Sequence, residues 1–235
     1  EAEAVLSPEK EREISIFTSD GRKLEGSFYP AVKAHAPLVI LMHWMRGDKS
    51  AWTEVAYWLQ NYSVTEVEQN QDDANKEESW LDPTWFPPLA EDESYNVLTF
   101  TFDGCLKNGC STMEREKWLR DAQAAYETAR SLEGVDSTRI IGIGASIGAD
   151  AAVDGCLYIN SLYPRTCQGI ISLSPGSYLN LDFKDVVTQL NSLEPPVSVQ
   201  CFYATGDSDS AEVCSTIKDS ENYTSVVYHG AEHGM

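Results

Sequence analysis

The sequence predicts an α/β fold in which one mostly parallel sheet carries helices on both faces. Three observations support this fold class: short apolar runs typical of buried strands recur along the chain, helical patterns alternate with them, and polar or glycine-containing turns separate the two. The 235 residues and their 42% hydrophobic content suffice for one core. We therefore expect a single domain over residues 5–235.

The predicted elements begin with an antiparallel hairpin, residues 12–17 and 23–29, around the turn Ser19-Asp20-Gly21. The continuous apolar run 37–44 is typical of a strand buried on both faces. The later strands are expected at residues 95–102, 139–143, 169–175, 197–206 and 224–230, and the helices at 51–60, 113–132, from 146 onward, 183–190 and 210–219.

The net charge of −20 limits the partners of the chain. Such a charge repels the phosphates of nucleic acid and disfavours docking on anionic lipid. The sequence also has no run of 18 apolar residues, which a membrane-spanning helix needs. We expect a monomer that binds neither nucleic acid nor membranes.

The first four residues and the cysteines indicate secretion. Residues 1–4, Glu-Ala-Glu-Ala, resemble the spacer left by a yeast secretion leader, so we exclude them from the domain as an expression scar. The order of the six cysteines suggests three local disulfides, Cys105–Cys110, Cys156–Cys167 and Cys201–Cys214. Fifteen pairings are open in principle, and buried free thiols in a cytosolic protein are the alternative. No cysteine pair has zinc-binding spacing, so we expect no metal site.

A serine between two glycines is the strongest chemical signal. The stretch Gly144-Ala145-Ser146-Ile147-Gly148 follows a predicted strand and precedes a predicted helix. This is the context of a nucleophile elbow, in which small residues allow a tight turn to present the serine. The helix start would aim the Ile147 N–H at a developing oxyanion. The alternative is an ordinary turn between a strand and a helix.

A serine nucleophile needs a base, and the chain has four histidines. The base for such an elbow follows the last strand, in the chain order serine, acid, histidine. His233 meets this condition best. His229 still belongs to the predicted last strand and is the weaker alternative.

The acid should follow the strand at residues 197–206, where the stretch Gly206-Asp207-Ser208-Asp209 offers two carboxylates. A Gly-x-x-Asp pattern favours Asp209 as the residue that orients the histidine. We expect Asp207 instead to cap a turn or a helix.

These motifs together resemble the α/β-hydrolase fold, in its esterase and dienelactone-hydrolase-like branch, over residues 12–235. The resemblance rests on the stretches 43–52, 144–148, 206–209 and 232–235. It implies Ser146 as nucleophile, Asp209 as acid and His233 as base. It also implies a second oxyanion donor in the loop after the strand at 37–44, namely the N–H of Met45, with Trp44 as the alternative.

Two features depart from this family. Its members normally carry a helix after the catalytic histidine, whereas the printed sequence ends two residues beyond His233; either the sequence is clipped or that helix is missing. The segment after the strand at 169–175, where a lid usually lies, is short. We therefore expect a minimal lid and an open site lined by Trp44 and Tyr178.

The sequence thus predicts a secreted, extracellular serine hydrolase of the carboxylesterase type. It would act through an acyl-enzyme on small or polymeric esters, without a cofactor. Dienelactone hydrolases proper use a cysteine nucleophile, so the serine favours ester hydrolysis more broadly. A peptidase or amidase of the same fold and a non-catalytic binding protein that retains the fold are the alternatives.

Overall fold

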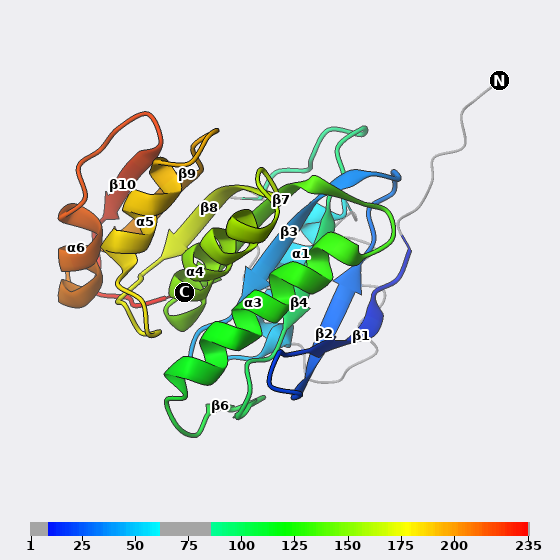
Figure 1. The fold of residues 1–235 in the computed structure, drawn as a ribbon, viewed down its shortest axis with the longest axis horizontal. Coiled ribbons are helices and arrows are strands. Elements are labelled where there is room, and N and C mark those ends of the chain that lie inside the picture. The colour runs from blue at the N-terminus through cyan, green and yellow to red at the C-terminus, as the bar shows by residue number, and fades with distance from the viewer. Residues whose placement is uncertain (1–8, 62–85, 235) are drawn as a thin grey trace.

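The computed structural model describes residues 9–61 and 86–234. Its centre is an eight-stranded sheet with the strand order β1-β2-β4-β3-β7-β8-β9-β10 (Figure 1). The hairpin β1–β2 and the pair β2–β4 are antiparallel, and all other neighbours are parallel. The strands of the sheet are β1 (Arg12–Phe17), β2 (Lys23–Tyr29), β3 (Ala36–Met42), β4 (Asn96–Phe100), β7 (Val135–Ala145), β8 (Cys167–Leu173), β9 (Ser198–Ala204) and β10 (Tyr223–Tyr228).

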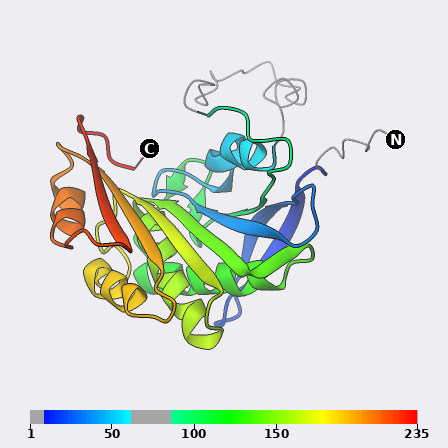
Figure 2. The ribbon, with the colours of Figure 1, turned by 90° about the horizontal axis from the view of Figure 1, so that it is seen from above.

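Helices cover both faces of this sheet. The helices α3, α4 and α5 pack on one face, and α1 lies on the other (Figure 2). The helical segments are η1 (Lys49–Trp52), α1 (Thr53–Leu59), α3 (Arg115–Ser131), α4 (Ile147–Leu162), α5 (Phe183–Asn191) and α6 (Ser208–Ser215). Each strand and helix expected from residues 12 to 230 has its counterpart, and the predicted fold class is confirmed.

Two features go beyond the sequence prediction. Strand β7 begins at Val135, four residues before the expected start. The sequence did not indicate this start because residues 136–139 are polar, and of these first residues only Val135 pairs with β3, through Ala36. A separate two-stranded hairpin, β5 (Cys105–Leu106) and β6 (Gly109–Cys110), follows β4. Its strands have two residues each, too short to give an alternating apolar pattern.

The core divides into two clusters, one on each face of the sheet. The larger cluster joins the sheet to α3, α4 and α5, and the smaller one joins it to α1 through Trp52, Val55 and Leu59. Six of the seven residues of β3 are buried, as its continuous apolar run predicts. The central strands are therefore held on both sides and provide a rigid base for the loops at their ends.

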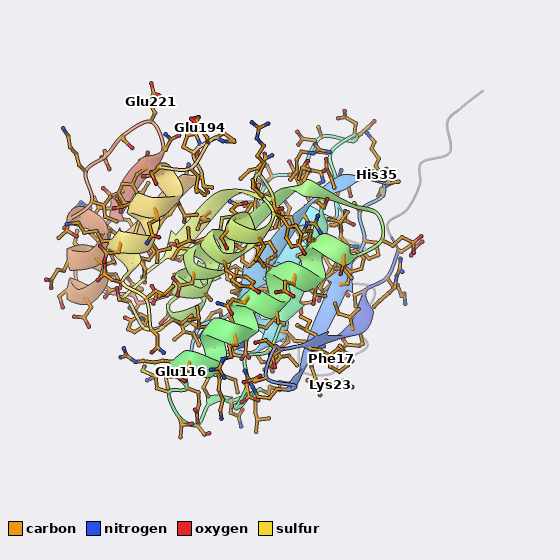
Figure 3. All side chains as sticks on the ribbon, viewed as in Figure 1. Phe17, Lys23, His35, Glu116, Glu194 and Glu221 are labelled. Atoms are coloured by element: carbon orange, nitrogen blue, oxygen red, sulfur yellow. A yellow bond between two sulfur atoms is a disulfide. The ribbon has the colours of Figure 1, made fainter. Side chains whose placement is uncertain are left out.

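The carboxyl ends of the parallel strands lie at one edge of the molecule. Figure 3 labels His35, Glu194 and Glu221, which directly precede or lie near the starts of β3, β9 and β10, at the opposite edge. Ligands of open α/β sheets bind beyond the carboxyl ends. The segments that follow β3, β7, β8, β9 and β10 are therefore the ones to inspect for a site.

The three disulfides expected from the cysteine order are confirmed. They are Cys105–Cys110, Cys156–Cys167 and Cys201–Cys214. The first closes the β5–β6 hairpin, the second joins α4 to β8, and the third joins β9 to α6. No helix within the described residues combines the length and apolar character that crossing a membrane requires.

Tyr126 locks α3 against α4 and β7. Its side chain is fully buried, and its hydroxyl donates a hydrogen bond of 2.9 Å to the carbonyl of Ala152. The ring occupies space that only glycines leave open: a Cβ on Gly142 would lie 2.1 Å from the tyrosine oxygen, and one on Gly155 would lie 2.4 Å from a ring carbon. The contact between helices and sheet thus depends on two missing methyl groups.

Two buried aspartates lie one turn apart on α4. Asp150 accepts hydrogen bonds from the backbone N–H groups of Gly176, Ser177 and Tyr178, at 2.6 to 3.4 Å. Burial raises the pKa of Asp150 to about 7, although these hydrogen bonds oppose the rise. Burial and the neighbouring Asp150 raise the pKa of Asp154 to about 8. Because three N–H groups stabilise the charged form of Asp150, we assign the proton of the pair to Asp154.

The Tyr126 contact predicts a non-additive pair of substitutions. Gly142→Ala should lower the free energy of unfolding by about 1–3 kcal/mol, because its methyl group overlaps the tyrosine oxygen. Tyr126→Phe should cost about 1 kcal/mol by removing one buried hydrogen bond. In the Tyr126→Phe background the overlap with oxygen is gone, so Gly142→Ala should cost clearly less. Urea unfolding of the four proteins measures the coupling; strictly additive losses would contradict this packing.

Asp154 predicts a stability that falls as the pH rises. Its folded pKa lies above the unfolded value of about 3.9, so the folded protein binds more protons than the unfolded chain between those values. The contribution of the protonated carboxyl is therefore complete below about pH 4 and is lost as the pH rises through the folded pKa. Asp154→Asn keeps the shape without titrating, so its unfolding free energy should fall less between pH 5 and pH 8.5. Parallel pH curves for the two proteins would refute the assignment.

Candidate active site

Ser146 lies in a strained turn between β7 and α4. Its backbone angles, φ 54° and ψ −118°, are sterically unfavourable for a residue with a Cβ and cost about 1–3 kcal/mol. The Ser146 N–H donates to the carbonyl of Leu173 at 2.8 Å, and the Ser146 carbonyl accepts the Ala149 N–H at 2.9 Å. These hydrogen bonds hold the turn in place, so the expected elbow geometry is present.

The glycines on each side of Ser146 have a steric reason. A Cβ on Gly144 would lie 2.0 Å from the carbonyl oxygen of Gly148, and a Cβ on Gly148 would lie 2.2 Å from the carbonyl oxygen of Met42. No real Cβ tolerates such contacts. The glycines therefore let the strand, the turn and the helix approach one another and the end of β3.

His233 lies between Ser146 and a carboxylate. Its Nε2 is 2.9 Å from the Ser146 Oγ, and its Nδ1 is 2.8 Å from the Asp207 Oδ2. A carboxylate accepts, so Nδ1 carries the proton and Nε2 accepts the serine O–H. The structure thus brings together the serine and histidine chosen from the sequence. The alternative His229 is exposed directly after β10.

The carboxylate at His233 is that of Asp207, which corrects the choice of Asp209. Asp207 lies at the N-cap of α6: its Oδ1 accepts the Ser210 N–H at 3.4 Å, and its Oδ2 is left for His233. The expected capping role is therefore right, but it does not exclude the contact with histidine. Asp209 lies exposed in the first turn of α6, where its Oδ1 accepts from the Ser208 hydroxyl. Asp209 lies two positions after the N-cap, within the helix, so its side chain leaves the backbone in a different direction from that of Asp207.

The electrostatics of Asp207 suit a permanently ionised partner. Burial alone would raise the pKa of this carboxyl, but hydrogen bonds from Ser210 and His233 outweigh burial and hold the pKa below its usual value. Asp207 is thus charged throughout the neutral range. A buried negative charge next to Nδ1 stabilises a positive charge on the His233 ring.

Ile147 and Met45 occupy the two positions expected of oxyanion donors. Ile147 is the first residue of α4, where backbone N–H groups lack a partner within the helix. Met45 follows β3, and the parallel register that pairs Met42 with Gly144 brings this loop beside the elbow. Within residues 9–61 and 86–234, neither the Met45 N–H nor the Ile147 N–H donates to another residue.

His43, on the core side of the loop after β3, holds this loop in place, a role that the sequence did not indicate. The ring is buried, and its Nε2 accepts the Phe102 N–H at 3.1 Å. The proton therefore lies on Nδ1, which donates to the Trp44 carbonyl at 2.7 Å. Burial lowers the pKa of His43 to about 4, which keeps the ring neutral. The one sequence signal for this role is that His43 directly follows a buried strand.

Trp44 and Tyr178 both lie beside the segment that carries His233. The tyrosine hydroxyl is 3.5 Å from the His233 Nε2, and the two rings meet edge to face. Burial and the charges of nearby aspartates raise the pKa of Tyr178 to about 12, so its hydroxyl stays protonated. Trp44 lies 3.8 Å from the space that a Cβ on Gly234 would occupy.

Solved structures with a similar fold are hydrolases of several kinds. A dienelactone hydrolase-like promiscuous phosphotriesterase from metagenomic libraries superposes with a TM-score of 0.61 at 14% identity, covering 95% of this chain and 83% of that one. The dienelactone hydrolase of Anabaena variabilis gives 0.60 at 13% identity, with 96% and 88% covered. A thermostable carboxylesterase cloned from a metagenomic library gives 0.59 at 13%, with 98% and 83% covered.

No protein-family model and no curated protein sequence matches the chain. The structural likeness extends over nearly the whole chain but at low identity, so it speaks for the fold rather than for the reaction. Together with the sheet order and the elbow after β7, it shows that this chain has the α/β-hydrolase fold.

Proposed function

We propose that this chain is a serine carboxylic-ester hydrolase. The observation that carries the proposal is the continuous hydrogen-bonded series from Ser146 through His233 to Asp207, with contacts of 2.9 and 2.8 Å. A serine hydroxyl is activated when a base lies within hydrogen-bond reach of it and a third group orients that base. The strained elbow that presents Ser146 supports the same role.

The reaction would proceed through an acyl-enzyme. The Ser146 Oγ attacks the ester carbonyl while His233 Nε2 takes the hydroxyl proton. The imidazolium then gives this proton to the leaving alcohol, and Asp207 stabilises the positive ring without itself becoming protonated. A water molecule enters, loses a proton to Nε2 and attacks the acyl carbon. The imidazolium then returns this proton to the Ser146 Oγ as the acyl bond breaks, which releases the acid and restores Ser146 and neutral His233.

The tetrahedral oxyanion would bind to the N–H groups of Ile147 and Met45. The start of the 16-residue helix α4 adds the positive end of its dipole to the Ile147 donor. Such donors act because they are fixed before the reaction begins, and loss of one costs about 10²–10³-fold in kcat. We keep Met45 as the second donor, as expected from the sequence. Its N–H belongs to the same peptide group as the Trp44 carbonyl, and the hydrogen bond from His43 to that carbonyl holds this peptide in place.

The surroundings of the site favour a small acyl group or an ester at a surface. Between β8 and β9 the chain forms one helix, the nine-residue α5, and no larger lid. The Tyr178 hydroxyl lies 3.5 Å from the His233 Nε2, and Trp44 lies beside Gly234 in the same segment. Three disulfides fit a protein that works in an oxidising, extracellular setting.

Ser146→Ala provides the first test. The variant removes the nucleophile but leaves the fold intact, because alanine is a smaller residue at the same position. We expect hydrolysis of p-nitrophenyl acetate to fall to background, and covalent labelling by a fluorophosphonate probe to disappear. Labelling of another residue in the wild-type protein, located by peptide mass spectrometry, would refute the assignment.

The two aspartates after β9 provide a matched pair. Asp207→Asn should lower kcat by about 10⁴-fold, because an amide neither fixes the His233 tautomer nor balances its charge. Asparagine remains a good N-cap, so α6 and the stability of the fold should persist. Asp209→Asn should change kcat less than about threefold. If the larger loss occurs at position 209, Asp207 is only a cap.

A further inference from the structure

We propose that the disulfide-closed β5–β6 hairpin positions the oxyanion donor Met45. This inference rests on the proposed esterase function and assigns a positioning role to residues outside the triad. The Cys110 N–H donates to the Met45 carbonyl at 2.8 Å. The hairpin therefore contacts Met45, whose N–H is the proposed donor to the oxyanion. This contact joins two segments that are more than sixty residues apart in the chain.

The peptide on the other side of Met45 is also held. The Trp44 carbonyl accepts from the His43 Nδ1 at 2.7 Å and from the Gly47 N–H at 3.0 Å. A trans peptide is planar, so the Met45 N–H points away from the Trp44 carbonyl. Rotation of this peptide would break both hydrogen bonds to the Trp44 carbonyl, and the Cys110 N–H holds the next peptide, between Met45 and Arg46, through the Met45 carbonyl. The direction of the donor is thus fixed from the core by His43 and from the outside by the hairpin.

Gly109 shows how closely the hairpin is pressed against the loop. A Cβ at this position would lie 2.6 Å from the Met45 carbonyl oxygen and 2.8 Å from the Arg46 Cα. Its φ of 96° already favours glycine. Gly104, at the other end of the same hairpin, has a φ of 76°, but a Cβ there meets nothing within 4 Å. The chain therefore offers two glycines with similar backbone strain, of which only one contacts the oxyanion loop.

The disulfide explains how so small a hairpin can act as a support. Two strands of two residues each are not stable alone. Cys105 is buried in the larger core, and its N–H donates to the Phe102 carbonyl at 3.0 Å. The bond to Cys110 transmits this anchoring to the strand that touches Met45. An oxyanion donor that needs no reorganisation during the reaction is the expected gain.

The glycine pair gives the sharpest test. Gly109→Ala should lower kcat at least tenfold, toward the loss of about 10²–10³-fold that follows removal of one oxyanion donor, with KM within about twofold. Gly104→Ala should leave kcat within about threefold. Affinity for a trifluoromethyl ketone, whose adduct carries the same oxyanion, should fall in proportion to kcat/KM. Equal kcat values for the two variants, or a loss confined to KM, would overturn the proposal.

A second comparison uses two disulfides. Replacing Cys105 and Cys110 by alanine should lower both the melting temperature and kcat. Replacing Cys156 and Cys167, which join α4 to β8 away from Met45, should lower the melting temperature alone. If both variants keep the wild-type kcat while folded, the hairpin does not position the donor. Fluorophosphonate labelling of Ser146 in the wild-type protein is checked first, since its absence would refute the esterase function instead.

Discussion

The contact between the start of α4 and the end of β3 is the constraint that places the turn at Ser146. A Cβ on Gly148 would lie 2.2 Å from the Met42 carbonyl oxygen, so this helix sits on the sheet only because the side chain is a hydrogen atom. The approach fixes three things at once: the strained φ of Ser146, the N–H of Ile147 at the helix start, and the loop that begins at His43.

Much of the fold follows from local patterns in the sequence. The apolar run that became β3, the spacing of Trp118 and Ala122 on α3, and the glycines around Ser146 each reflect forces that act within a few residues. Parallel order then places the ends of β3, β7 and β9 at one edge. For this reason the sequence could predict that Ser146 and His233 lie close together, since that prediction needs only the strand ends and the chain order.

The acid could not be chosen in this way. Asp207 and Asp209 are separated by one residue, and the pattern around them suits either role; only the backbone path at the start of α6 decides which carboxylate turns toward His233. The contacts of His43 and of the β5–β6 hairpin could not be predicted from the sequence for a different reason. These contacts, with Phe102 and Met45, join segments about sixty residues apart and follow no periodic pattern that a sequence displays.

Asp207 shows how one side chain can cap a helix and also contact a histidine. A carboxylate has two oxygens: one accepts the Ser210 N–H at the helix start and the other faces the His233 Nδ1. The cap fixes the torsion of the carboxylate, and the side chains of Ser210 and His233 lower its pKa against the effect of burial. The helix thus supplies orientation as well as charge stabilisation. Asp209, within the first turn of α6, makes its hydrogen bond with the Ser208 hydroxyl instead and does not contact His233.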